Sequence, residues 1–288
     1  MKSTSALRDL NDLTASQWGM VTAAQAVARG VTRMNLSRLT KDGQLERLGH
    51  GVYRDAGTPT DRFSGVKAAW LSVEPTLTAD QRLRAAADAV VSGATASFVL
   101  GLGDIVPEPY EFTVPARRQT QRNELVFHIG QLASESITIR DGLPVTTPEQ
   151  TIADLVERRA DRSLVAGVLA DVDAFDRERL VALVAPLAQR NGFRRDDGEA
   201  FVAELERLAG RDVDSLAKAL LDALQPGLDG HRESITSIAR AIIATAPPNP
   251  ALAKQVSRLV EAANQANPAM PATGLTHDDS NSDKERPR

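Results

Sequence analysis

The sequence predicts a helix-rich α+β protein that begins with a winged helix-turn-helix. Two observations set the class: the chain has 288 residues, of which 42% are hydrophobic, and only 4% are aromatic. Such a chain can bury a sizeable core in two or three small, mostly helical domains. A third observation, three short helical patterns followed by a hairpin pattern in residues 1–57, supplies the winged helix.

Beyond residue 57 the pattern changes twice. Residues 58–162 mix helical spacing with β-branched runs, which predicts a small α/β domain with an antiparallel sheet. Residues 163–263 read as short helices throughout, so we expect an all-α region there. Residues 264–288 are polar, contain prolines and lack large apolar side chains, which is typical of a disordered tail.

Charge separates the first segment from the others. The chain has a formal net charge of -4, but residues 1–57 carry +3, residues 58–150 carry −3 and residues 151–288 carry −4. A basic segment on an acidic chain indicates a local anionic partner rather than a generally adhesive surface.

Several classes of protein are excluded or disfavoured by composition. The chain has no cysteine, so disulfides, thiol catalysis and cysteine zinc sites are excluded. The N-terminus lacks the apolar core of a signal peptide, and no run of about 18 apolar residues could span a membrane. A soluble, cytoplasmic protein without membrane partners is the expectation.

The first two helices are marked by apolar spacing and by caps. The first helix carries apolar residues at helical intervals: Leu7, Leu10, Leu13 and Trp18. It is expected to end near Gly19, and Thr22 is the expected N-cap of a second helix, "TAAQAVARG". Gly30 stands where a glycine is favoured just past a helix end.

The third helix and the hairpin complete the winged pattern. Thr32 is the expected N-cap of "TRMNLSRLTKDG", and Gly43 ends it. The following stretch, "QLERLGHGVYR", reads as two strands joined at the glycines around His50. Two helices joined by a short turn and followed by a β-hairpin are typical of a winged helix-turn-helix.

The third helix has the two faces that a recognition helix needs. Leu36, Leu39 and Thr40 fall on one side, and the opposite side is polar and basic. The residues predicted to face the major groove are Arg33, Met34, Ser37, Arg38 and Lys41. We expect Arg38 and Arg33 to reach guanine edges and Lys41 to reach phosphate. The alternative is that this face is only solvated, as on any amphipathic helix.

Two further basic groups are candidates for DNA contact. The hairpin would place Arg47, His50 and Arg54 near the flanking backbone or minor groove. A second cluster, Arg117, Arg118 and Arg122, lies between the predicted strands "YEFTVP" and "ELVFHI". It suits phosphate or an acidic protein partner, and a solvated hairpin loop is the alternative.

The same search finds no convincing catalytic site, metal site or cofactor site. The four histidines lie in separate segments, and no serine is framed as a nucleophile elbow. Asp171 and Asp173 resemble a carboxylate pair that could hold Mg²⁺ for a nuclease, whereas Asp176 fits better as the N-cap of the next helix. Thr147, followed by Pro148 and Gln150, is likewise the expected start of a helix.

Longer stretches of the chain resemble the AbiEi-type antitoxins of type IV (AbiE) toxin–antitoxin systems. The matching stretches, in order, are "ASQWGMVTAAQAVARGVTRMNLSRLTKDGQLERLGHGVYR", "AAWL", "TVPARR" and "GLPVTTPEQTIADL". They cover roughly residues 10–160. The family's histidine-containing start of a middle helix is replaced here by Ser92-Gly93-Ala94-Thr95-Ala96, so no role is carried onto that helix.

The resemblance implies a two-part protein. The winged helix would bind repeats in its own promoter and repress the operon, and the domain after it would neutralise a nucleotidyltransferase-type toxin without requiring a stable complex. Because one winged helix reads few base pairs, either a homodimer or cooperative binding is expected. The alternative function is a stand-alone winged-helix regulator whose helical region senses a signal or mediates dimerisation.

Overall fold

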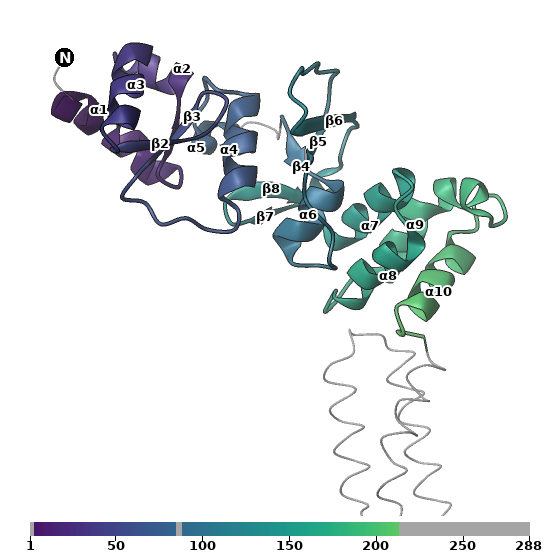
Figure 1. Ribbon diagram of the computed structural model, residues 1–288. Helices are drawn as coiled ribbons and strands as arrows, with labels where there is room; N and C mark the ends of the chain where they lie inside the picture. The colour runs from purple at the N-terminus through teal and green to yellow at the C-terminus, as the bar shows by residue number, and fades with distance from the viewer. Residues whose placement is uncertain (1–2, 85–87, 213–288) are drawn as a thin grey trace, which may run out of the picture. The chain divides into compact units, whose positions relative to one another are not determined.

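The computed structural model describes residues 3–84 and 88–212 (Figure 1). The expected disordered tail at 264–288, and the part of the expected helical region that follows residue 212, lie outside the described residues. Within the described residues the fold is α+β, as the sequence predicts, and it begins with a winged helix-turn-helix.

The N-terminal module confirms the predicted helices and hairpin. Its elements are α1 (Ser3–Ser16), β1 (Met20–Thr22), α2 (Ala23–Ala28), α3 (Arg33–Lys41), β2 (Leu45–Gly49) and β3 (Val52–Asp55). Thr22 caps α2 by accepting a hydrogen bond from the backbone amide of Gln25, and the Gln25 side chain completes a capping box. Thr32 caps α3 by accepting from the amide of Asn35.

The sequence patterns missed one strand of this module. β1 is three residues long, fully buried, and pairs antiparallel with β3, so that the sheet has the order β1-β3-β2. A strand this short with every residue buried has no alternation to detect. The core beneath the sheet is built from small and branched apolar side chains: Ala6, Leu10, Leu13, Val21, Ala26, Val31, Leu36, Leu39 and Leu45.

The middle region is built on a five-stranded sheet. Its elements are α4 (Ser64–Val73), α5 (Ala79–Arg84), β4 (Val90–Val91), α6 (Gly93–Leu100), β5 (Tyr110–Val114), β6 (Leu125–Ile129), a 3-10 turn (Ser134–Ser136), β7 (Ile137–Arg140) and β8 (Leu143–Thr146). The strand order is β6-β5-β4-β8-β7.

The predicted antiparallel sheet is confirmed for only two of the four strand pairs of the middle region, because the sheet is mixed. β4 pairs antiparallel with β5, and β7 with β8, but β5 runs parallel to β6 and β4 runs parallel to β8. Strand direction depends on the connections, which the β-branched composition of a strand does not reveal. The segment 115–124 is too long for a tight hairpin, and it returns the chain so that β6 starts at the same end as β5.

The winged helix and the middle region share a core. Met20 and Val52 of the winged-helix sheet belong to the same buried cluster as Trp70 of α4 and Phe112 of β5. Figure 1 shows α4 between the two sheets. Trp18, between α1 and β1, packs edge-on against Trp70 with ring centroids 6.2 Å apart. The winged-helix module is therefore fixed on the middle region by buried apolar contacts.

The described helices after the sheet form a second layer with its own core. They are α7 (Pro148–Glu157), α8 (Arg162–Ala170), α9 (Arg177–Val184), two 3-10 turns (Ala185–Leu187 and Gln189–Asn191) and α10 (Gly198–Leu208). Thr147 caps α7 as predicted. Figure 1 shows this layer on the side of the five-stranded sheet away from the winged helix.

Candidate nucleic-acid interface

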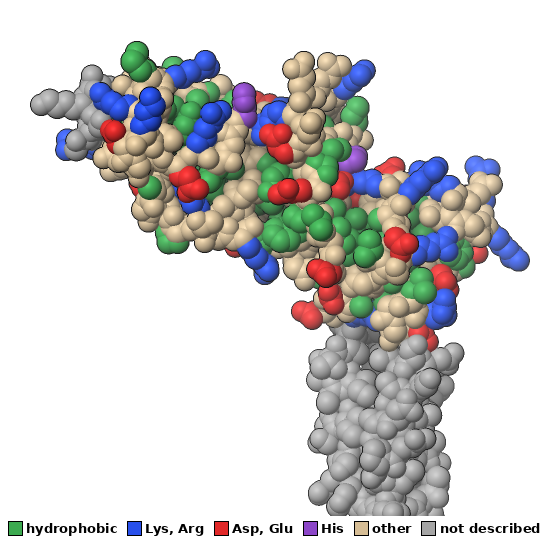
Figure 2. Space-filling model, in the orientation of Figure 1, with side chains coloured by type: hydrophobic (Ala, Val, Ile, Leu, Met, Phe, Trp, Pro, Cys, Tyr) green, Lys and Arg blue, Asp and Glu red, His purple; other side chains and the backbone are tan. Residues whose placement is uncertain are grey.

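Helix α3, the predicted recognition helix, is held by its apolar side, which leaves its basic side in solvent. Leu36 and Leu39 are completely buried in the module core. The side chains opposite them are all exposed: Arg33, Met34, Ser37, Arg38 and Lys41. In Figure 2, Lys and Arg side chains gather over this end of the molecule. The five predicted contact residues of α3 therefore form one accessible face.

The wing contributes two of its three predicted contacts to the surface. Arg47 and His50 are exposed, and the Nε of Arg47 donates to the carbonyl of Gly49 at 3.2 Å. Arg54 differs, because its residue is only 5% exposed and its guanidinium lies 2.5 Å from the carboxylate of Glu46. Glu46 and Arg54 face each other across the β2–β3 pair. Arg54 therefore stabilises the hairpin from within and does not lie on the accessible surface that the predicted DNA contact requires.

A group of buried glutamines joins the recognition module to the middle region. Gln17 and Gln25 are 1% and 3% exposed and hydrogen-bond to each other at 2.6 Å. Gln25 also donates to the carbonyl of Leu77 at 2.7 Å, and Gln17 accepts from the amide of Ala79 at 3.3 Å. These polar contacts fix the orientation of α2, and with it α3. Sequence patterns give no signal of them because the partners are far apart along the chain.

The second basic cluster is mostly tied to the protein itself. Arg118 lies 2.5 Å from the carboxylate of Glu74 and donates to the carbonyl of Val73. Arg122 donates to Ser72 at 2.7 Å and to Glu124 at 2.8 Å. Both arginines thereby attach the loop 115–124 to the end of α4.

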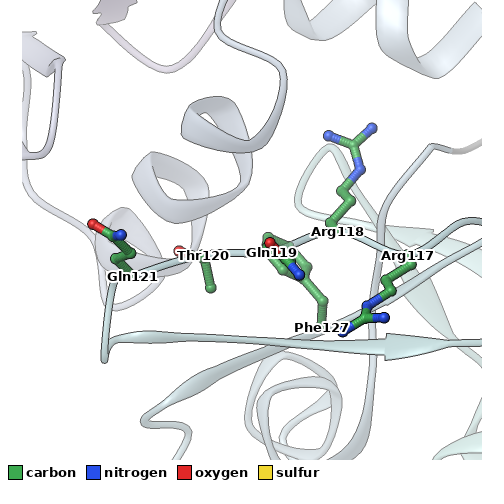
Figure 3. Close-up of a pocket in the computed structure, with 6 residues that line it drawn as sticks. All are labelled: Arg117, Arg118, Gln119, Thr120, Gln121 and Phe127. Atoms are coloured by element: carbon green, nitrogen blue, oxygen red, sulfur yellow. The ribbon is translucent and has the colours of Figure 1, made fainter.

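Arg117 is the exposed member of that cluster. In Figure 3 its side chain and that of Arg118 point to opposite sides of the loop. The loop borders an open concavity of about 560 Å³. Its lining is mainly polar and consists of Arg117, Arg118, Gln119, Thr120, Gln121 and Phe127.

The wing and this loop lie near each other. The pKa of Glu124 is held below its usual value, chiefly by the hydrogen bond from Arg122 and in small part by the charge of His50. The turn of the wing therefore lies within electrostatic range of the end of the loop 115–124.

A separate polar network lies among α6, α7 and the sheet. Glu111 accepts from Arg158 at 2.5 Å and contacts His128 at 2.9 Å. Burial alone would raise the pKa of Glu111, but the hydrogen bond from His128 and the charge of Arg158 hold it below the usual value. Burial raises the pKa of the nearby Asp154. Glu111, His128 and Arg158 thus partner one another, whereas Oδ2 of the buried Asp154 has no hydrogen-bond partner among the described residues.

Gly93, at the start of α6, lies against this network. Gly93 has a φ of +57°, and a Cβ there would lie 1.8 Å from Nη1 of Arg158. A side chain at position 93 would displace the guanidinium of Arg158, and the positive φ itself favours glycine there.

Of the two acidic residues considered for a nuclease, Asp171 and Asp173, the first has a structural role. Asp171 accepts from the amide of Gly103 at 2.8 Å, and Asp176 caps α9 as predicted. Among residues 3–84 and 88–212, no three His, Cys, Asp or Glu side chains form a group that could hold a metal ion. In the same part of the chain, no helix is both long enough and apolar enough to cross a membrane.

Comparison with known proteins supports the regulator reading of the first module. Residues 8–54 match the protein family described as "Transcriptional regulator, AbiEi antitoxin". No curated protein matches the chain. Among solved structures, the RV2827C protein from Mycobacterium tuberculosis is similar, with 18% sequence identity, a TM-score of 0.47, and coverage of 74% of this chain and 80% of that one.

Proposed function

We propose that this protein is an antitoxin of a type IV toxin–antitoxin system that represses its own operon by binding repeats in its promoter. Its second activity is to neutralise a nucleotidyltransferase-type toxin, without catalysis and without requiring a stable complex. It acts in the cytoplasm. The observation that carries the DNA-binding half is the exposed basic face of α3 opposite a fully buried apolar stripe.

In this proposal α3 lies in the major groove. Arg33 and Arg38 each present a guanidinium that can donate two parallel hydrogen bonds to a guanine edge, and Lys41 lies one turn further on and reaches phosphate. Arg47 and His50 of the wing contact the flanking backbone.

The loop 115–124 supplies a second basic contact through one arginine instead of the three that the sequence predicted. Arg117 reaches phosphate, with Gln119 and Gln121 as neutral donors beside it. Arg118 and Arg122 hold the loop in place rather than contacting DNA, because both are engaged by α4 or by the loop itself.

The antitoxin half rests on the resemblance and on the family match of residues 8–54. Co-expression with a nucleotidyltransferase-type toxin gene encoded beside this one tests it. Growth restored by this protein supports neutralisation, and continued arrest contradicts it.

The alternative is a stand-alone regulator in which the helical region senses a signal or mediates dimerisation. It is favoured by the extent of the family match, which ends at residue 54, and by the separate core of the α7–α10 layer. An adjacent toxin gene would favour the antitoxin, and its absence would favour the stand-alone regulator.

The first experiment is a mobility-shift titration on the protein's own upstream DNA, with scrambled competitor, at two salt concentrations. Specific retardation that weakens steeply with salt is expected, because phosphate contacts release counterions. Weak retardation without sequence preference would contradict a promoter-binding role.

A further inference from the structure

Met34 is an apolar side chain in the middle of an otherwise polar surface. It is 80% exposed, more than any other large apolar side chain in residues 3–84 and 88–212. It lies on the face that carries Ser37, Arg38 and Lys41, at the helical spacing that aligns them into one stripe. Single exposed apolar side chains are common on protein surfaces, so the place of Met34 within α3 decides whether a partner is expected.

The position within α3 indicates what that partner is. α3 begins at Arg33, so Met34 is the second residue of the helix. In helix-turn-helix proteins the N-terminal residues of the recognition helix are the ones that reach base edges. The major-groove edges of the bases offer one apolar group, the C5-methyl of thymine. Methionine is long and unbranched, which lets its terminal methyl adapt to such a target.

We infer that Met34 is a specificity-determining residue that recognises a thymine by packing on its C5-methyl group. The inference rests on the proposed DNA-binding function and extends it, because it assigns one base of each half-site and a recognition chemistry other than hydrogen bonding. Arg33 and Arg38 flank this contact and read neighbouring guanines.

The test removes the methyl group from the DNA and its partner from the protein, separately and together. Each thymine in the mapped promoter site is replaced in turn by deoxyuridine, which keeps every hydrogen-bonding group. Dissociation constants are measured by fluorescence anisotropy for the wild type, for Met34→Ala, and for Val106→Ala. Val106 is a matched control, since it is also highly exposed (73%) and lies outside the interface.

We expect one thymine per half-site whose replacement weakens wild-type binding about fourfold, the value for one buried methyl group. The same replacement should not change DNA binding by Met34→Ala. It should weaken DNA binding by Val106→Ala about as much as binding by the wild type. Because Met34 is exposed, the alanine variant should melt at the wild-type temperature.

The inference would be overturned if the wild type binds its site specifically but no thymine replacement weakens wild-type binding more than binding by Met34→Ala. The proposed function would then remain intact. A change in oligomeric state in Met34→Ala, measured by light scattering, would also overturn it and would assign Met34 to a protein interface. Absence of specific binding by the wild type would instead contradict the proposed function itself.

Discussion

The two basic clusters of this chain look alike in sequence and differ in the structure. On α3, Arg33, Arg38 and Lys41 point to solvent because Leu36 and Leu39 must be buried on the other side. In the loop 115–124, Arg118 and Arg122 are engaged by Glu74 and Ser72, which the fold brings to them. An amphipathic helix thus decides the exposure of its own charges, whereas the exposure of loop arginines depends on distant residues.

The largest expected effect comes from removing the cause of exposure on α3. Leu36→Asp would place a carboxylate in a fully buried site without a partner, so we expect a loss of roughly 4 kcal/mol or more. Circular dichroism and thermal unfolding would show the loss, and DNA binding would disappear with it. As a control, Gln119→Asp in the exposed loop should change stability by less than about 0.5 kcal/mol. A folded Leu36→Asp protein would contradict the packing of α3.

Arg38→Ala should separate binding from stability. We expect specific DNA binding to weaken by about 1–3 kcal/mol if Arg38 reads a base, with sequence preference relaxed at one position and an unchanged melting temperature. Fluorescence anisotropy on specific and scrambled DNA would measure both changes. Arg207→Ala on α10 is the matched control, because Arg207 is an exposed arginine with a local partner, Glu204. Equal binding by the two variants would remove Arg38 from the interface.

Arg158 lies outside both basic clusters and forms a partly buried ion pair with Glu111. The lowered pKa of Glu111 means that its contribution to stability is present above the ordinary pKa of 4.5 and is lost as pH falls through the folded-state value. Glu111→Gln should therefore destabilise by about 1–2 kcal/mol at neutral pH and flatten the loss of stability in acid.

Urea unfolding between pH 3 and 7 would measure the effect of Glu111→Gln, with the exposed Glu135→Gln as the control. The raised pKa of Asp154 acts with the opposite sign, because protonation of this buried carboxyl favours the folded state. An acid profile unchanged by Glu111→Gln would assign the acid sensitivity to other carboxylates.

Alanine variants of Arg118 and Arg117 should affect different properties: the first the free energy of unfolding, the second the salt dependence of DNA binding. Arg118→Ala removes a partly buried ion pair and should lower the free energy of unfolding by about 1 kcal/mol. Arg117→Ala should leave stability unchanged and reduce the salt dependence of DNA binding by about one phosphate contact. The reverse assignment of effects would mean that the loop rearranges on DNA.

The sequence predicted those features that depend on residues close together in the chain, and it missed those that depend on distant residues. Caps such as Thr22, Thr32 and Asp176 were predicted correctly because their partners lie within three residues. The exposed face of α3 was predicted because periodicity determines it. The parallel pairing of β5 with β6 and the burial of Arg54 were missed, since both depend on segments that meet only in the folded chain.

Lys41→Ala should have the smallest of these effects. It tests most directly whether the exposed face of α3 contacts phosphate. If Lys41 neutralises a phosphate, binding should weaken alike on all sequences, and the slope of log K against log salt should fall by about 0.9. Titrations at several salt concentrations on specific and scrambled DNA would measure both. A slope unchanged by Lys41→Ala would mean that exposure alone does not make a cation a contact. The difference between the two clusters would then be one of packing and not of DNA recognition.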